Sequence, residues 1–425
     1  MKKTITLLFI IWSNILLAQV KITGNIALRD IIKLQGIEKS DSINWYFENE
    51  KNTYHALQGM HSAQLILSPM YENGKLQAII YKKNGNIVKS DELKVGKFKA
   101  PYSNDWFKNS KYGLSHTFDY LMLKRVAKAG DRLKTSETWD DVINQFDVDA
   151  YVKQVQESGA GFVLFALGQN SGYYCSPNAA YEKYTGYKRG FRTPHRDLPM
   201  EIGKKLAKKG IRFMLYLSGN PPRDDQHAQK SFYYPYYPGE GPPSQQTAKM
   251  WGEVIREWSN RYGKLLSGWW FDGMWYTQSY KMDQPYNFHS RALDAKSGNS
   301  TRIITFSMGL GNSFRNDYAF EDYTGGEVNN LSVFPENRWS NQANKQQWFA
   351  YTFLGENVPI WAGWGNKGLS KNTDNLVTWS KKVIAREGVI CLDCYVSRYG
   401  AIDNEQRLQL KHLRKAIRTN SKPHK

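Results

Sequence analysis

A single carboxylate stands inside an aromatic stretch. Asp272, in "LLSGWWFDGMW" (residues 265–275), has Trp270 and Trp275 as neighbours. Burying a charge among aromatic side chains is costly unless the charge is paired or used. A carboxylate at a strand end can attack an anomeric carbon while a second carboxylic acid protonates the leaving oxygen. Because sugar rings stack on aromatic faces, Asp272 is a candidate nucleophile between candidate aromatic walls. The alternative is a structural aspartate that caps the next helix or pairs with a lysine.

The second carboxylic acid has two candidates in "FEDYTGGEVNN", residues 320–330. Glu327 lies in a glycine-rich segment, from which a general acid can reach over a substrate. Glu321 stands at the end of an apolar run and competes for the same role. An ordinary exposed glutamate is the alternative for Glu327, so the sequence leaves the acid and base unassigned.

Polar and aromatic residues follow the other apolar runs, where a substrate would be bound. His116 is a candidate for hydrogen bonding or for catalytic base, and arginines bind sulfate and carboxylate groups in a bidentate manner. The further candidates for substrate binding are Gln169, Asn170, Tyr173, Arg223, Trp364 and Arg398. The histidines show no metal-ligand spacing, and a lone C-x-x-C at 391–394 lies within an apolar run. We therefore expect no metal site and no cofactor.

Short apolar runs alternate with amphipathic helical stretches through residues 103–425. The runs lie at 112–118, 161–167, 211–217, 268–272, 302–307, 318–322, 358–363 and 389–394. The clearest helical stretches lie at 148–159, 198–210, 247–263, 375–388 and 405–419. This α/β alternation predicts a (β/α)8 TIM-like barrel, whose active site forms at the carboxyl ends of the strands.

Residues 19–98 have a different pattern. Short stretches of alternating apolar and polar residues are separated by turn signals such as "ENGK" and "KNGN". This pattern predicts a small all-β sandwich of the immunoglobulin-like type, with Trp45 in its core. A linker then leads into the barrel.

The chain begins "MKKTITLLFIIWSNILLAQ", which predicts a signal peptide at residues 1–18 and an exported, periplasmic or secreted protein. A lipid anchor is not expected, because there is no cysteine near the cleavage point. The apolar run is too short for stable membrane insertion. The formal charge of +19 suggests a polyanionic partner, although lysines that merely coat the surface would also explain it. For an exported protein, an acidic or sulfated polysaccharide is favoured over nucleic acid, and no protein partner is predicted.

Several segments resemble, in order, the motifs of one family. They are "WFKNSKYGLSHTF", "FDVDAYVKQVQESGAGFVLFA", "REWSNRYGKLLSGWWFDGMW", "EDYTGGE" and "GVICLDCYVSRYGAIDNEQRLQLKHL". Together they are similar to the α-L-fucosidase family, glycoside hydrolase family 29. The resemblance implies that Asp272 is the nucleophile and that the acid and base lies near Glu327.

The chain departs from that family at the end of the second strand. A paired-histidine segment, H-H-D-G-F, normally binds fucose hydroxyls there, but this sequence reads "GQNSGYY" with Gln169, Asn170 and Ser171 in those places. The resemblance therefore implies fucosidase-like chemistry, with different side chains binding the sugar hydroxyls.

Three functions are compatible with these features. The first is a fucosidase-like retaining glycoside hydrolase acting on an acidic or sulfated polysaccharide or oligosaccharide. The second is a polysaccharide lyase or oligosaccharide dehydratase, which would use His116 or a tyrosine as base on a uronic acid. The third is a non-catalytic glycan-binding protein. An unsaturated product that absorbs in the ultraviolet would distinguish elimination from hydrolysis.

Overall fold

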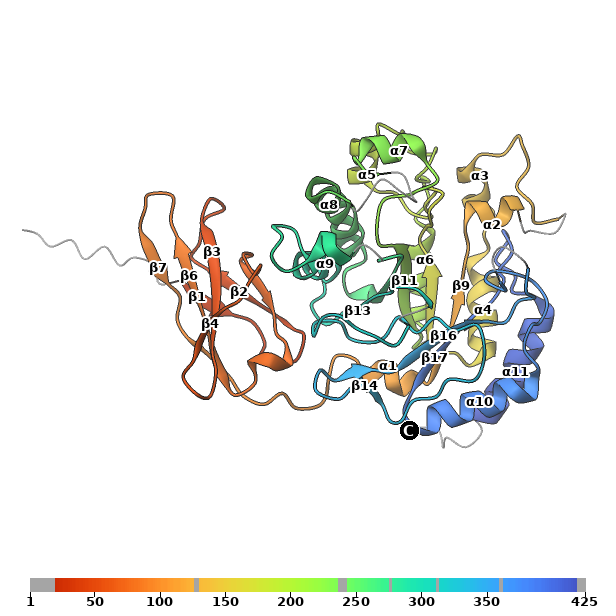
Figure 1. Cartoon of the computed structure of the whole chain (residues 1–425). Helices are drawn as coiled ribbons and strands as arrows, with labels where there is room; N and C mark the ends of the chain where they lie inside the picture. The colour runs from red at the N-terminus through yellow and green to blue at the C-terminus, as the bar shows by residue number, and fades with distance from the viewer. Residues whose placement is uncertain are drawn as a thin grey trace, which may run out of the picture.

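The computed structural model describes residues 20–125, 130–235, 243–274, 277–310, 313–358 and 362–418. Antiparallel sheets formed by the first hundred residues lie on one side, and a parallel sheet with surrounding helices forms the rest (Figure 1). The expected signal peptide, residues 1–18, falls outside the described residues.

Two antiparallel sheets form the N-terminal part. The three-stranded sheet has the order β1-β2-β5, and the five-stranded sheet has the order β4-β3-β6-β7 with β8 beside β6. Their bounds are β1 Lys21–Thr23, β2 Ile31–Gln35, β3 Ser42–Glu48, β4 Tyr54–Ala56, β5 Gln64–Ile66, β6 Gly74–Tyr81, β7 Ile87–Lys89 and β8 Leu93–Val95. Every second residue of β3 is buried, as the alternation predicted. Trp45 is fully buried in the shared core, and its indole N–H donates to the carbonyl of Ser62.

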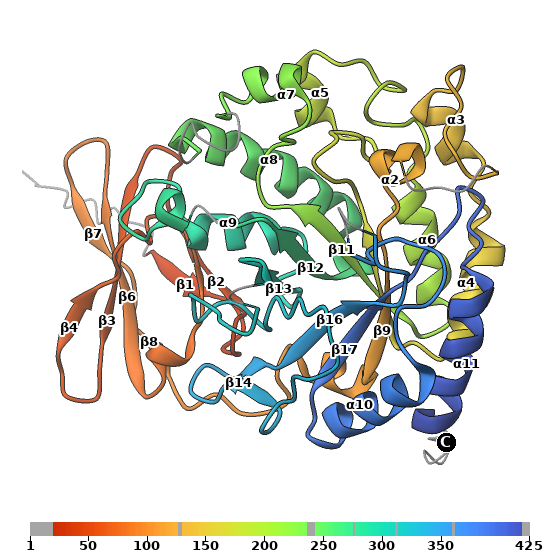
Figure 2. The ribbon, with the colours of Figure 1, turned by 45° about the vertical axis from the view of Figure 1, so that its right-hand side comes forward.

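The second part is built on a curled parallel sheet. Within the described residues it has seven strands in the order β13-β12-β11-β10-β9-β17-β16 (Figure 2). Their bounds are β9 Tyr112–His116, β10 Phe162–Ala166, β11 Arg212–Ser218, β12 Leu266–Asp272, β13 Ile303–Phe306, β16 Phe349–Phe353 and β17 Val389–Asp393. All neighbouring pairs are parallel, so the carboxyl ends of the strands meet at one edge.

Side chains of these strands alternate between two cores. In β12, Trp269 and Phe271 join the cluster that packs under the helices, whereas Trp270 joins the cluster inside the sheet. Asp272 has the same parity as Trp270, so its carboxylate points inward at the end of the strand. In β9 the same rule sends Ser115 inward, where its hydroxyl bonds to that of Tyr351.

Helices cover the outer face of the sheet. Their bounds are α1 Asp105–Ser110, α2 Tyr120–Arg125, α3 Trp139–Asn144, α4 Val148–Ser158, α5 Ala179–Thr185, α6 Leu198–Ala207, α7 Gln226–Ser231, α8 Gln245–Tyr262, α9 Phe288–Ala295, α10 Thr373–Ala385 and α11 Asn404–Arg418. Asp147, Asp197 and Ser244 cap α4, α6 and α8 by accepting backbone N–H groups in the first turn. The five helical stretches predicted from the sequence are all present.

The described residues do not form a closed ring of eight regular strands. The predicted strand at 318–322 is absent, the prediction at 358–363 falls partly outside the described residues, and β16 is a strand that we did not predict. Residues 322–328 instead lie between β13 and β16, with parallel bridges from Tyr323 to Gln347 and from Glu327 to Tyr351. Residues 339–347 form a separate two-stranded ribbon, β14 Trp339–Asn341 and β15 Gln346–Gln347.

Side-chain carboxylates explain why 318–322 is not a strand. The Asp322 N–H donates to the carbonyl of Ile304 at 2.9 Å, as in a strand pair. The Asp322 and Glu321 carboxylates then accept the N–H groups of Ile304 and Phe306, each at 3.0 Å. These carboxylates replace the carbonyls that a regular neighbouring strand would supply.

Arg29 joins the N-terminal sheets to this irregular segment. Its fully buried guanidinium donates to the carbonyls of Ala319, Asn344 and Lys345 and lies 3.7 Å from Asp322. Lys296 approaches the other oxygen of Asp322 at 3.3 Å. The N-terminal part therefore holds in place the segment that leads to Glu327.

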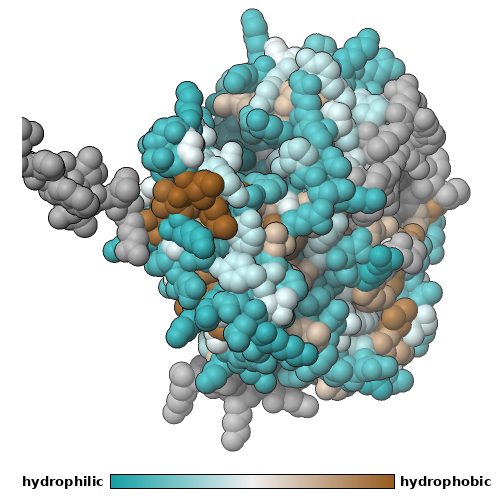
Figure 3. Space-filling view, turned by 60° about the vertical axis from the view of Figure 1, so that its left-hand side comes forward, coloured by the Kyte–Doolittle hydropathy of each residue, from teal (hydrophilic) through white to brown (hydrophobic). Residues whose placement is uncertain are grey.

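The surface seen in Figure 3 is mostly hydrophilic, with hydrophobic residues confined to small patches. In the part of the chain that the structure describes, no helix is both long enough and apolar enough to cross a membrane. All three cysteines are buried and free.

Candidate active site

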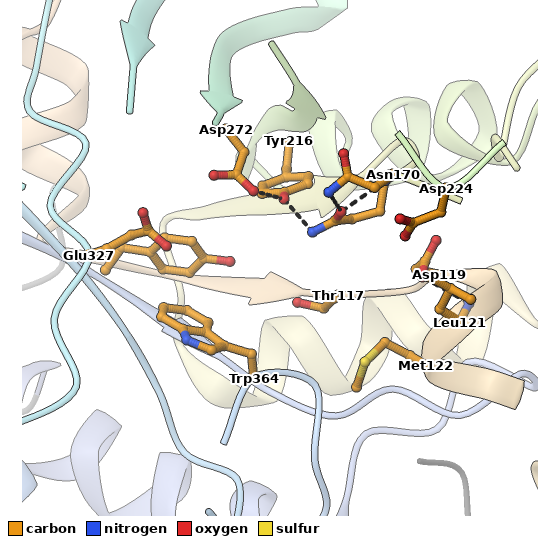
Figure 4. Close-up of a pocket in the computed structure, with 12 residues that line it drawn as sticks. Thr117, Asp119, Leu121, Met122, Asn170, Tyr216, Asp224, Asp272, Glu327 and Trp364 are labelled. Atoms are coloured by element: carbon orange, nitrogen blue, oxygen red, sulfur yellow. Dashed lines mark hydrogen bonds between the residues drawn. The ribbon is translucent and has the colours of Figure 1, made fainter. Parts of the chain in front are cut away.

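A cavity of about 190 Å³ opens at the carboxyl ends of the strands (Figure 4). Its polar lining residues are Thr117, Asp119, Gln169, Asn170, Asp224, Asp272 and Glu327. Its aromatic and apolar lining residues are Leu121, Met122, Tyr216, Tyr351 and Trp364. Asp272 and Glu327 come from elements far apart in the sequence and face the same cavity.

Asp272 is oriented by a chain of hydrogen bonds. The Tyr216 hydroxyl donates to Asp272 Oδ2 at 2.5 Å and accepts from Gln169 Nε2 at 2.6 Å. Gln169 Oε1 accepts both the backbone N–H and the side-chain amide of Asn170, at 2.9 and 2.8 Å. Because Oε1 is committed as acceptor, the Gln169 amide must donate to Tyr216, and Tyr216 must donate to Asp272.

Three groups around Asp272 favour its ionised form and oppose the effect of burial. Burial raises the pKa of Asp272 above its ordinary value, while the Tyr216 hydroxyl, the Gly273 N–H and the charge of Arg223 act in the opposite direction. The side chain is only partly buried, because one face of it meets the cavity. A hydrogen-bonded, ionised carboxylate at this place can act as a nucleophile or as an electrostatic stabiliser.

Glu327 has the opposite environment. Burial and the negative charge of Asp272 raise its pKa to about 8, and the one bond that opposes this comes from Ser307, whose Oγ lies 3.0 Å from Glu327 Oε2. Glu327 therefore carries a proton at neutral pH. Two carboxyl groups in one pocket whose environments separate their pKa values can work as nucleophile and general acid.

Aromatic rings line one side of the cavity near these carboxyl groups. Trp364 is half-buried and meets the ring of Tyr351 edge-on, with centroids 4.6 Å apart. Trp270 does not reach the cavity, because it is fully buried and stacked on Tyr216, and its indole N–H donates to the carbonyl of Gly325. Trp364 thus offers an aromatic face to the cavity, whereas Trp270 belongs to the core.

His116 and Glu321 do not lie at the cavity. His116 is fully buried on the helix side of β9, with Nδ1 2.9 Å from the carbonyl of Cys394, and burial lowers its pKa to about 4. Glu321 is also buried, where its pKa is raised to about 7 and its oxygens accept three backbone N–H groups and the Asn316 amide. Both side chains hold neighbouring segments in place.

Two further candidates do not line the cavity, and a third falls outside the described residues. Tyr173 is stacked on Tyr120 with centroids 3.9 Å apart and has the Arg192 guanidinium over its ring. Arg398 is 1 % exposed and bonds to both oxygens of Glu137, so it does not meet solvent at the mouth. Trp275 falls outside the described residues.

The far end of the cavity holds carboxylates that we did not predict as site residues. Asp119 is buried, accepts from Ser171 Oγ at 2.9 Å, and has a pKa raised by burial to about 6. Asp224 is exposed and lies 3.7 Å from Arg223 at the rim. Neither lysine nor arginine is among the described lining residues, and the described His, Cys, Asp and Glu side chains form no group of three suited to a metal ion.

Tyr216 and Thr117 were also missed, although the sequence carries a signal for both. Within "IRFMLYLS", Tyr216 lies two residues before Ser218, the last residue of β11, which pairs with Asp272. Because side chains alternate along a strand, Tyr216 points to the same inner face as Ser218. Thr117 follows His116, so its side chain points to the inner face of the sheet while that of His116 points to the helices. Alternation along each strand distinguishes such inward-facing residues from their neighbours.

Residues 90–422 match the family model described as alpha-L-fucosidase. No curated protein matches the chain. Among solved structures, the endo-fucoidan hydrolase MfFcnA4 of glycoside hydrolase family 107 is 15% identical with a TM-score of 0.54, and the alignment covers 73% of this chain and 53% of that one. This chain therefore spans about half the length of that protein.

Two other solved structures are similar to this chain. The endo-fucoidan hydrolase P5AFcnA of family 107 is 12% identical with a TM-score of 0.53, over 77% of this chain and 96% of that one. A bacterial fucosidase with a monovalent iminocyclitol inhibitor is 16% identical with a TM-score of 0.53, over 76% and 75% of the two chains. At these identities the likeness is one of fold.

Proposed function

The chain belongs to the α-L-fucosidase family, and from this premise we propose that it is a retaining glycoside hydrolase acting on fucose-containing glycans. The observation that carries the proposal is the pairing of Asp272 and Glu327 in one cavity with opposed environments. One carboxylate is hydrogen-bonded in its ionised form, and the other holds a proton at neutral pH.

The reaction would proceed in two steps. Asp272 attacks the anomeric carbon and forms a glycosyl-enzyme, while Glu327 gives its proton to the departing glycosidic oxygen. Glu327, now ionised, takes a proton from water as the water attacks the same carbon and releases Asp272. Tyr216 keeps Asp272 ionised and fixes its direction before the attack, since its hydroxyl can only donate to that carboxylate.

The sugar bound in the cavity would be a neutral one. Besides the protonated Glu327, the described lining residues include three carboxyl groups, Asp119, Asp224 and Asp272, and no cation, so a sulfate or carboxylate there would be repelled. Gln169 and Asn170 supply amides in place of the family's paired histidines, and Trp364 supplies an aromatic face. Anionic groups of an acidic or sulfated substrate would lie outside this cavity.

The lyase alternative receives little support from this geometry. Elimination from a uronic acid needs a cation at the carboxylate and a base beside it. His116 is buried away from the cavity, and no described lining residue is a cation.

Two finer expectations extend the proposal. We propose that residues 322–328 take the place of an eighth strand in a (β/α)8 barrel, supported by their parallel bridges to β15 and β16. We also propose that the protein is exported to the periplasm or beyond, supported by the lysines and the apolar run at its N-terminus.

The test is the stereochemistry of hydrolysis together with the loss of the nucleophile. Proton NMR of the reaction with an aryl α-L-fucoside should show the α-anomer of fucose as the first product. Asp272→Asn should lower kcat by about four orders of magnitude or more. The exposed Asp283→Asn, the same chemical change elsewhere, should leave kcat unaltered. Inversion of configuration, or normal turnover by Asp272→Asn, would overturn the proposal.

A further inference from the structure

A second pocket lies against the segment that follows Glu327. It is a groove of about 510 Å³ between α10 and the segment that follows Glu327, and we call it the lysine pocket. The lining residues that matter here are Asn329, Phe334, Asn357, Lys371, Asn375 and Lys382. Its described lining contains amides, hydroxyls, aromatic rings and two lysines, but no carboxylate, so its charge is opposite to that of the catalytic cavity.

One side chain, Phe353, contacts a lining residue of each pocket. The ring of Phe353, buried in β16, meets Trp364 of the catalytic cavity with centroids 5.1 Å apart. Lys371 Nζ lies 3.9 Å from the centroid of the same ring. Lys371 Nζ also donates to the backbone carbonyl of Asn329 at 2.9 Å, two residues after Glu327. The ammonium is therefore held against the segment that follows the general acid.

Lys371 is a cation without a counter-ion among the described residues. Its amine bonds to two neutral oxygens, the Asn329 carbonyl and Ser370 Oγ, and no described carboxylate is within ion-pair distance. Burial is the cause that lowers its pKa, to about 8. A half-buried charge without a counter-ion is costly, and an anionic ligand that binds it removes that cost. Lys382, in α10, adds a second positive charge over Phe334.

The position of this cation relative to the reaction assigns it to the leaving side. Glu327 must face the glycosidic oxygen to protonate it, so the sugar beyond that oxygen passes near Glu327 and the segment after it. Lys371 is bonded to that segment. Exposed amides of Asn329 and Asn357 flank the same groove and can bond to sugar hydroxyls or to sulfate oxygens.

We propose that the lysine pocket is an anion-binding subsite in which Lys371 pairs with a sulfate ester or a carboxylate on the sugar that is linked to the fucose. This inference rests on the proposed function for the orientation of the substrate. It reconciles a strongly basic protein with an acidic catalytic cavity: the neutral fucose enters the cavity, and the negative charge of the glycan stays on the other side of Glu327.

The test compares Lys371→Gln, just before α10, with the control Lys381→Gln, an exposed lysine of α10 that does not line the pocket. The substrates are a neutral aryl α-L-fucoside, sulfated fucan oligosaccharides, the same oligosaccharides after desulfation, and fucosylated oligosaccharides containing a uronic acid. Lys371→Gln should raise KM about tenfold for the anionic substrates, the effect of one charge-assisted hydrogen bond, with kcat retained. Both constants should be unchanged for the neutral substrates.

Three comparisons make the result specific. A loss confined to the sulfated substrate identifies sulfate, and a loss confined to the uronic acid substrate identifies carboxylate. Lys371→Arg should restore most of the affinity, because it keeps the charge. Raised ionic strength should weaken the preference of the wild-type protein for anionic substrates. Equal KM values for Lys371→Gln and Lys381→Gln on every anionic substrate would overturn the proposal.

A binding measurement separates this inference from the hydrolase proposal. Calorimetric titration of Asp272→Asn with sulfated oligosaccharide should give a Kd about ten times lower than that of Asp272→Asn/Lys371→Gln. If the wild-type protein hydrolyses no fucoside, the proposed function fails, but this difference in Kd still supports the subsite. Equal Kd values in the two proteins refute the subsite whatever the activity.

Discussion

Ser307→Ala should shift the basic limb of the pH–rate profile upward. Ser307 Oγ donates to Glu327 Oε2 at 3.0 Å and favours the ionised carboxylate, so its loss raises the pKa of Glu327 above about 8. A hydrogen bond to a charged group is worth about 1.5 kcal/mol at the low end, which suits a side chain facing a cavity. At about 1.4 kcal/mol for each pH unit, the expected shift is about one pH unit.

The assay is kcat/KM as a function of pH, which reports the free enzyme. The substrate should be a fucosyl-oligosaccharide, because its sugar leaving group needs the proton from Glu327. The acid remains protonated to higher pH in Ser307→Ala, so activity on the alkaline side should extend further than in the wild type. The acidic limb, which reports Asp272, should stay where it is.

The matched control is Ser313→Ala. Ser313 Oγ donates to the backbone carbonyl of Glu327 at 2.5 Å and does not touch the carboxyl group. The control should leave the basic limb in place. A downward shift in Ser307→Ala, or no shift, would show that Ser307 does not stabilise the ionised form. A wild-type basic limb near the ordinary pKa of a glutamate would refute the assignment of Glu327 as a buried acid.

Three other predictions follow from the same contacts. Tyr216→Phe should lower kcat/KM about tenfold and move the acidic limb to higher pH, because Asp272 loses the donor that favours its ionised form; a pH–rate profile measures both. Glu321→Ala should lower the free energy of unfolding by about 2–4 kcal/mol in denaturant titration, since buried N–H groups lose their acceptor. Arg398→Ala should lower Tm without changing KM. Arg398 holds the pKa of Glu137 down to about 2 from 4.5, so the pair stabilises the fold above pH 4.5 and this contribution disappears as the pH falls toward 2; thermal melts across that range should show a smaller acid effect in the variant.

The helices and most strands could be predicted because their patterns are local. Gly159 ends α4 in the left-handed conformation, which glycine adopts readily, so the end of the predicted helical stretch at 148–159 is marked in the sequence. The strand at Phe349–Phe353 could not be separated from the apolar run at 358–363, because both are short and hydrophobic. The pairing of Phe349 with Val389 in β17 places the run at Phe349–Phe353 in the sheet, and that contact is not local in the sequence.

The candidate site was predicted in part for a related reason. Asp272 and Glu327 were found from residue type and resemblance, and both face the cavity. His116 was chosen because it ends a strand, but its parity directs it to the helix layer. Arg398 was chosen for its charge near a strand end, but Glu137, from a segment far away in the sequence, binds it. Charge alone does not tell which arginine is already paired.

The buried bonds of Arg29 have a consequence for how the molecule unfolds. Arg29 supports the irregular segment at Ala319 and Asp322, and Ile31 and Ile66 of the N-terminal sheets pack into the main core of the parallel sheet. The two parts therefore share buried contacts that neither can satisfy alone. We expect the chain to denature in a single cooperative transition, and we expect a fragment lacking the first hundred residues to lose the order around Glu327 rather than to survive as a trimmed enzyme.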